Sequence, residues 1–321
     1  MRGAGGAAAR KNKAAIILAG PTASGKSALA LALARRMGGT VINADAMQCY
    51  RELRIITARP SPEDEAMAPH RLYGVRAAGE PANAAWWRKA ALEEMEQAAL
   101  PILCGGTGMY FSALVKGIAD IPEPGATARA KARGLLAEIG PEALHARLDA
   151  ETGAKLKPGD SQRIARAYEV LLATGKGLAW WQAQPAPGLE GWDLRMILLD
   201  PPREALREAI ATRFAAMLAG GALEEVEQFL ALGLDPALPL MRAHGVPELA
   251  AYLRGEATLG EAQARAVLVT SQYTKRQMTW FRHQKLVEKP AMQIIQSRIG
   301  GFTQLSESFL RDLDNFIKQP R

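Results

Sequence analysis

Hydrophobic residues along this chain form two kinds of pattern. Short apolar runs occupy 14–19, 40–44, 101–104 and 194–199, and each is followed directly by a glycine or an aspartate. Between them lie longer stretches, such as 26–37 and 83–100, whose apolar residues recur at helical spacing. Buried strands that alternate with helices in this way predict an α/β fold with a parallel sheet covered by helices on both faces.

Proline-rich breaks divide the chain into parts. Only helical patterns lie between the break at 121–125 and the apolar run that starts near 194. We therefore expect an all-helical insertion at 123–192 and a core domain built from 14–122 and 193–286. A disordered, Gly- and Ala-rich leader is expected at 1–13, and the tail at 287–321 suggests no function.

Composition narrows the class of protein. The chain has 321 residues, two cysteines and a net charge of +7, and its apolar runs are too short to span a membrane. Two cysteines are too few for a disulfide framework and favour a reducing cytoplasm. The positive charge hints at a polyanionic partner, although many basic proteins bind no nucleic acid.

A glycine-rich loop follows the first apolar run. Residues 20–27 satisfy the pattern G-x-x-x-x-G-K-[ST] between a predicted strand and a predicted helix, as in nucleotide-binding and ATP-binding proteins of the P-loop NTPase-like class. The expected diphosphate- or nucleotide-binding residues are Gly20, Pro21, Thr22, Ala23, Ser24, Gly25, Lys26 and Ser27. Their N–H groups would cradle phosphates, and the hydroxyl of Ser27 could bind Mg²⁺.

The loop alone does not decide the reaction. An ATPase or kinase usually has an acidic residue at the end of a neighbouring strand to hold magnesium. Here the run at 101–104 ends in Gly105-Gly106-Thr107, whereas Asp45 and Asp200 end other strands. The nucleotide-hydrolase interpretation therefore lacks one of its usual parts.

Six blocks in order identify a resemblance. They are GPTASGKS, VINADAMQCY with ITARP, PHRLYG, ILCGGTGMY, SQRIARAYEV and KRQMTWFR, spread over roughly residues 15–285. Together they resemble the tRNA dimethylallyltransferases. The resemblance implies transfer of a dimethylallyl group from dimethylallyl diphosphate to the exocyclic amine of the adenosine beside the anticodon. The expected substrates are tRNAs that read codons beginning with U, and diphosphate is released.

The resemblance also implies roles for individual residues. Asp45 matches the family's general base, Thr107 matches a residue near the reacting centre, and Arg213 matches an arginine that reaches the diphosphate. Mg²⁺ is the implied cofactor. The implied partners are the anticodon stem-loop of tRNA and dimethylallyl diphosphate, with no membrane, for a cytoplasmic protein that we expect to be a monomer.

Basic and aromatic residues at helical spacing match the family's RNA contacts, as unpaired RNA requires. The expected tRNA-binding residues are Asp45, Ala46, Met47, Gln48, Thr107, Arg129, Gln162, Arg163, Ile164, Ala165, Arg166, Lys275, Arg276, Gln277, Thr279, Trp280 and Arg282. The target adenine would have to leave its stack to react, so a channel for RNA is expected.

Some positions depart from the family pattern, and two alternatives remain. Serine is more common in the family where Ala46 and Asn43 stand, and Ser271 replaces a cation, so tRNA affinity could be weakened. A small-molecule kinase would need an acid on the third strand and a lid with paired arginines, which Arg163 and Arg166 could mimic. An RNA-binding scaffold with a relic phosphate loop is the non-enzymatic alternative.

Overall fold

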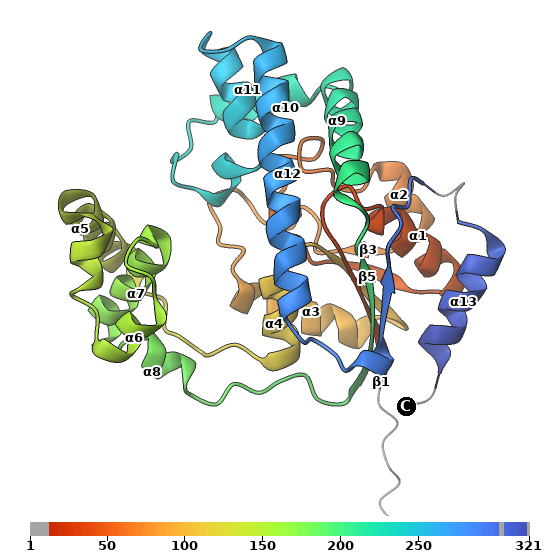
Figure 1. The fold of residues 1–321 in the computed structure, drawn as a ribbon, viewed down its shortest axis with the longest axis horizontal. Coiled ribbons are helices and arrows are strands. Elements are labelled where there is room, and N and C mark those ends of the chain that lie inside the picture. The colour runs from red at the N-terminus through yellow and green to blue at the C-terminus, as the bar shows by residue number, and fades with distance from the viewer. Residues whose placement is uncertain (1–12, 302–304, 320–321) are drawn as a thin grey trace, which may run out of the picture. The chain divides into compact units, whose positions relative to one another are not determined.

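The computed structural model describes residues 13–301 and 305–319. Its centre is a sheet of six parallel strands in the order β3-β2-β4-β1-β5-β6, which confirms the predicted α/β fold (Figure 1). The strands are β1 (Lys13–Ala19), β2 (Thr40–Asn43), β3 (His70–Arg71), β4 (Pro101–Gly105), β5 (Trp192–Leu199) and β6 (Met292–Ile295). The four predicted apolar runs are strands β1, β2, β4 and β5.

Two compact units make up the described chain. One unit comprises Val115–Leu189, where the sequence predicts a helical insertion at 123–192, and contains α5 (Gly125–His145), α6 (Ala150–Lys155), α7 (Ser161–Thr174) and α8 (Leu178–Gln182). The other unit holds the sheet and the remaining elements. The predicted leader at 1–13 lies outside the described residues, except for Lys13, which begins β1.

The sheet unit contains the remaining helices. They are α1 (Lys26–Met37), α2 (Pro62–Met67), α3 (Ala84–Gln97), α4 (Gly108–Lys116), α9 (Arg203–Ala219), α10 (Ala222–Ala231), α11 (Val246–Leu253), α12 (Leu259–His283) and α13 (Glu307–Lys318). Short 3₁₀ turns occur at Met47–Cys49, Pro239–Arg242 and Lys289–Ala291.

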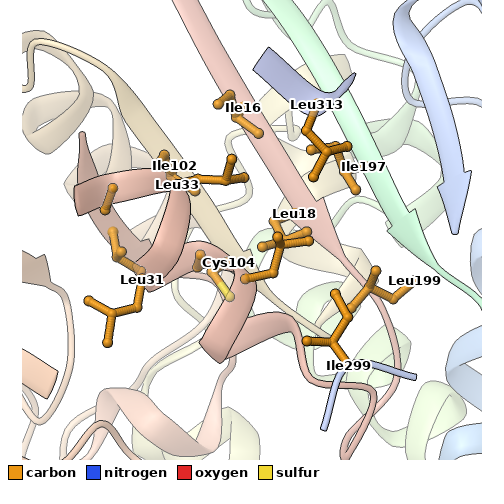
Figure 2. Close-up of a cluster of buried hydrophobic side chains, with 14 of the residues drawn as sticks. Ile16, Leu18, Leu31, Leu33, Ile102, Cys104, Ile197, Leu199, Ile299 and Leu313 are labelled. Carbon is orange, nitrogen blue, oxygen red and sulfur yellow. The ribbon is translucent and has the colours of Figure 1, made fainter. Parts of the chain in front are cut away.

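Branched aliphatic side chains cover one face of the sheet. Figure 2 shows Ile16 and Leu18 of β1 beside Ile102 of β4, with Leu31 and Leu33 of α1 against them. Ile16, Leu18 and Leu33 have no exposed surface, and full burial of one such side chain stabilises a fold by about 1.5–3 kcal/mol. This core fixes where β1 ends and α1 begins, and hence where the intervening loop lies.

Aromatic residues pack together beside the sheet. Trp87 of α3 stacks on Tyr110 of α4 with 4.6 Å between ring centroids, and its indole N–H donates to the carbonyl oxygen of Asn43 at the end of β2. Phe111 of α4 lies 6.2 Å from Phe281 of α12. These contacts place the long helix α12 next to the strands that carry the predicted site.

The tail, which had no predicted structure, completes the sheet. Strand β6 pairs with β5, and α13 contributes Leu313 to the core shown in Figure 2. Arg36 of α1 forms ion pairs with Glu307 at 2.8 Å and with Asp314 at 2.6 Å on α13. Residues 292–301 and 305–318 therefore belong to the architecture of the sheet unit.

Candidate active site

The glycine-rich loop joins β1 to α1 at the carboxyl ends of the parallel strands. Two of its residues have left-handed backbone, Ala23 at φ 63° and Gly25 at φ 93°. Such turns point successive N–H groups to one side, and the first N–H groups of α1 have no carbonyl partner within the helix. This backbone has the geometry that anion-binding loops use, which is the role that the sequence predicts for residues 20–27.

Two polar side chains of the loop face its interior. Lys26 is half-buried and donates to the carbonyl oxygen of Pro21 at 3.2 Å. Burial lowers the pKa of the Lys26 ammonium, whereas the nearby Asp45 charge raises it. The hydroxyl of Ser24 is fully buried and has no hydrogen-bond partner within the described chain, so an anion or a water can use it.

Thr22 is held in the loop from two different helices. Arg213 of α9 donates to the Thr22 hydroxyl. Gln277 of α12 accepts from the Thr22 N–H at 3.1 Å and donates to the carbonyl oxygen of Gly106 at 3.0 Å. Gln277 therefore positions the loop against the end of β4, which is a different role from the tRNA contact expected for it, because its amide is buried and bonded to both groups.

Arg213 lies in the same electrostatic environment as Asp45. Burial lowers the pKa of the Arg213 guanidinium, and the charge of Asp45 raises it. The charge of Asp45 acts on Lys26 as well as on Arg213, and Arg213 is bonded to Thr22 of the loop, so Asp45 lies near both cations. The structure therefore places the residue expected to be the general base near the two cations expected at the diphosphate.

The backbone around Asp45 is fixed by neighbouring polar groups. Asn43 accepts from the Asp45 N–H at 2.8 Å and donates to the Asp45 carbonyl oxygen at 3.0 Å. The Thr107 hydroxyl accepts from the Ala46 N–H at 3.0 Å. Asn43, which the sequence marked only as a departure from the family pattern, is thus a positioning residue, and Thr107 holds the same turn from β4.

Residues 45–48, which follow β2, are half-buried. The Asp45 carboxylate accepts from the Met47 N–H at 3.1 Å through one of its two oxygens. Gln48 donates to the carbonyl oxygens of Thr57 and Ala58 at 2.8 and 3.0 Å. The Gln48 side chain therefore braces the turn at 57–58, where Ala58 has left-handed backbone.

A stripe of residues on α12 lines an open surface hollow of about 520 Å³. Its lining residues are Gln272, Lys275, Arg276, Thr279 and Trp280, of which Gln272 was not predicted. A Cβ at Gly108 would lie 2.2 Å from the Trp280 ring, so only glycine permits this close approach. Arg282, from the same helix, is paired with Asp200 at 2.9 Å.

The helical unit carries the other predicted RNA contacts. On α7, Gln162 and Arg163 are exposed and Arg166 is half-buried, with Arg163 paired to Asp160 and Arg166 to Glu169. Two neighbours do not match the prediction. The Ile164 and Ala165 side chains are buried because they form the apolar face of α7, so they cannot contact an external ligand.

Arg129 belongs to the same unit. It is half-buried near the start of α5, where its guanidinium lies 3.7 Å from the carboxylate of Glu123.

Metal ligands are sparse in the described residues. No cluster of three or more His, Cys, Asp or Glu side chains there could hold a metal ion, and no helix there is long and apolar enough to cross a membrane. Ser27 is exposed at the start of α1 and can supply one oxygen. This fits Mg²⁺, which commonly takes one or two protein ligands and completes its shell with substrate phosphates and water.

Comparison with known proteins decides the family. The family model described as IPP transferase matches residues 48–284, and the model described as isopentenyl transferase matches 13–77. The chain belongs to the tRNA dimethylallyltransferase family. Over 305 residues it is 63% identical to the tRNA dimethylallyltransferase of Acidiphilium cryptum, with 94% of each chain covered. The enzyme of the same name from Granulibacter bethesdensis is 59% identical, with 96% of this chain and 99% of the relative covered.

Solved structures agree with this membership. The tRNA isopentenylpyrophosphate transferase of Bacillus halodurans has a TM-score of 0.65 at 27% identity, with 95% of this chain and 97% of that chain covered. A eukaryotic dimethylallyltransferase acting on tRNA has a TM-score of 0.78 at 24% identity, with 96% and 82% covered, and it supports the fold alone. The fold described above is therefore similar to that of solved tRNA-prenylating transferases.

Proposed function

We propose that this chain transfers a dimethylallyl group from dimethylallyl diphosphate to the exocyclic amine of the adenosine beside the anticodon of tRNA. Family membership makes it a prenyltransferase that acts on tRNA. The observation that carries the site assignment is the grouping of Asp45, Lys26 and Arg213 around the loop. One carboxylate near two cations suits an alkyl transfer in which the acceptor loses a proton and the donor loses diphosphate.

The residues divide the chemistry between them. The amine nitrogen attacks the first carbon of the dimethylallyl group, the bond from that carbon to oxygen breaks, and the electron pair leaves with diphosphate. Asp45 accepts the proton that the amine loses and orients its lone pair. Lys26, Arg213 and the loop N–H groups stabilise the charge that develops on the leaving oxygens.

Mg²⁺ would be held by Ser27 and by the diphosphate itself, where it would neutralise charge on the leaving group. The loop offers a hydroxyl and N–H groups, and the described chain offers no carboxylate cluster beside it. Such a site suits a diphosphate that arrives with its own metal ion.

RNA would be held by each of the two units through its own residues. In the sheet unit these are the α12 residues around the surface hollow, Lys275, Arg276, Thr279 and Trp280. In the helical unit they are Arg129, Gln162, Arg163 and Arg166. Exposed cations suit backbone phosphates, and Trp280 offers a ring on which a base can stack.

Label transfer tests this function. Purified protein is incubated with Mg²⁺, radiolabelled dimethylallyl diphosphate and an unmodified anticodon stem-loop, and label on the RNA is counted. Asp45→Asn, which keeps the acceptor for the Met47 N–H, is expected to lower the rate at least about a hundredfold. The matched variant Asp312→Asn, on the exposed face of α13, is expected to leave it unchanged.

The same mixture separates the alternatives. Phosphate transfer from labelled ATP without label on RNA would support a kinase, and RNA binding with neither reaction would support a scaffold. Family membership favours the transferase over both. Light scattering of the purified protein tests the expected monomer, and the two free, buried cysteines are consistent with the expected cytoplasmic location.

A further inference from the structure

Residues that follow β6 are in direct contact with the phosphate loop. The Ile299 N–H donates to the carbonyl oxygen of Ser24 at 3.0 Å, and Arg298 Nε donates to the carbonyl oxygen of Ala23 at 3.1 Å. A Cβ on Gly25 would lie only 1.9 Å from the Ile299 carbonyl oxygen. The segment 298–299 therefore forms one wall of the loop.

This wall is anchored in the sheet. Strand β6 pairs with β5 up to the partners Leu199 and Ile295, and the Asp200 N–H donates to the Ile295 carbonyl oxygen at 2.8 Å. Ile295 and Ile299 are both buried in the core of Figure 2, where Ile299 lies beside Leu199. The position of Arg298, between these buried isoleucines, is thus set by the fold.

Arg298 brings a third cation to the loop. Its side chain is exposed, and its charge adds to the effect of burial in lowering the pKa of Arg213. Lys26, Arg213 and Arg298 therefore surround the loop with Asp45 as the nearby anion. Like charges held together are unfavourable unless an anion lies among them, and a diphosphate supplies that charge.

The orientation of Arg298 suits this anion. Because Nε is bound to the Ala23 carbonyl oxygen, the planar guanidinium is fixed beside the loop and its terminal nitrogens are left for a ligand. Arginine binds phosphate oxygens through two parallel hydrogen bonds, whereas lysine offers a point charge.

We propose that Arg298 is a diphosphate-binding residue of the donor site, acting with Lys26 and Arg213 and held in place by the segment after β6. This rests on the proposed function for the identity of the donor. The assignment of Arg298 depends on the contacts that residues 298–299 make with the loop. The sequence predicted no function for this part of the chain.

Titration with inorganic pyrophosphate and Mg²⁺ tests the proposal without the transfer reaction. Calorimetry compares wild type with Arg298→Gln, Arg298→Lys and the control Arg311→Gln, whose side chain is exposed on α13. Arg298→Gln is expected to weaken pyrophosphate binding about tenfold, the low end for a charged hydrogen bond at an exposed site. Arg298→Lys is expected to recover part of the loss, Arg311→Gln to match wild type, and the affinity for an unmodified anticodon stem-loop to stay the same in all four proteins.

Two results would overturn the proposal. One is pyrophosphate affinity within twofold of wild type in Arg298→Gln. The other is an equal loss of pyrophosphate affinity in Arg298→Gln and Arg298→Lys, together with an equal drop in the melting temperature of the ligand-free proteins. That pattern would show that the side chain supports the loop and that its charge does not bind the ligand. Transfer kinetics keep the two proposals apart: wild type that labels no RNA refutes the proposed function, whereas wild type that labels RNA with an unchanged donor KM in Arg298→Gln refutes only the role of Arg298.

Discussion

Replacing Gln277 by alanine should loosen the phosphate loop from the sheet. The side chain is 5% exposed and joins the Thr22 N–H to the Gly106 carbonyl oxygen, two groups that belong to different strand ends. Alanine removes both bonds and leaves both backbone groups in a largely enclosed place. The same change should weaken pyrophosphate binding, because Thr22 is part of the loop.

The expected cost follows from the two bonds. Each contributes about 1 kcal/mol net, and each buried group left without a partner adds a penalty of about 1–3 kcal/mol unless water enters. Because a cavity left by one methylene and an amide can admit water, we expect the free energy of unfolding to fall by about 2–4 kcal/mol. Gln272→Ala, on the exposed part of the same helix, should change it by less than about 0.5 kcal/mol.

Urea unfolding followed by circular dichroism measures both variants. Gln277→Glu provides a further check, because its carboxylate keeps the bond from Thr22 but faces the Gly106 carbonyl oxygen unless it is protonated. Its folded-state pKa should therefore lie above the unfolded value, so its stability should rise toward that of wild type as the pH falls and be lost as the pH rises. A loss below about 0.5 kcal/mol in Gln277→Ala would refute the bridging role.

Three further outcomes are expected. Gly25→Ala should abolish pyrophosphate binding and lower the melting temperature, because alanine at φ 93° would meet the Ile299 backbone. The control Gly260→Ala, with open space around it in α12, should not lower the melting temperature. A stable Gly25→Ala variant that binds pyrophosphate would contradict this expectation. Burial raises the pKa of the Cys104 thiol to about 12, so the unfolded chain ionises first and stability should fall from about pH 9 to pH 12 by up to about 1.4 kcal/mol per pH unit. Cys104→Ala should show a shallower fall when urea unfolding is repeated across that range, and equal slopes would argue against the shift. Arg163→Gln should weaken stem-loop binding a few-fold and reduce its salt slope by about one in filter-binding titrations, whereas an unchanged slope would remove Arg163 from the RNA surface.

Local patterns were enough to predict much of the fold. The runs at 14–19, 40–44, 101–104 and 194–199 are continuous and apolar, so their burial on both faces of a sheet could be inferred. Strand β6 could not, because Met292–Ile295 is a four-residue edge strand interrupted by Gln293 and follows no apolar run. Its place depends on pairing with β5, which is a long-range contact.

The site divides in the same way. The loop and Asp45 lie at the ends of recognisable strands, and the family resemblance supplied Arg213. Gln277 was misjudged because its partners are 255 and 171 positions away, so spacing on α12 placed it beside the RNA stripe without showing that it points inward. Burial on α7 likewise separates Ile164 and Ala165 from the more accessible Gln162, Arg163 and Arg166, although the five residues are consecutive.

The dependence of the loop on the segment after β6 has a consequence for biosynthesis. A ribosome makes residues 20–27 early, but the Ile299 and Arg298 contacts that wall the loop can form only after about 270 further residues have been translated. Nascent chains stalled before residue 292 would carry a complete glycine-rich sequence and no working donor pocket. Premature termination late in the message should therefore yield inactive protein, and not a shortened enzyme that competes for the isoprenoid donor.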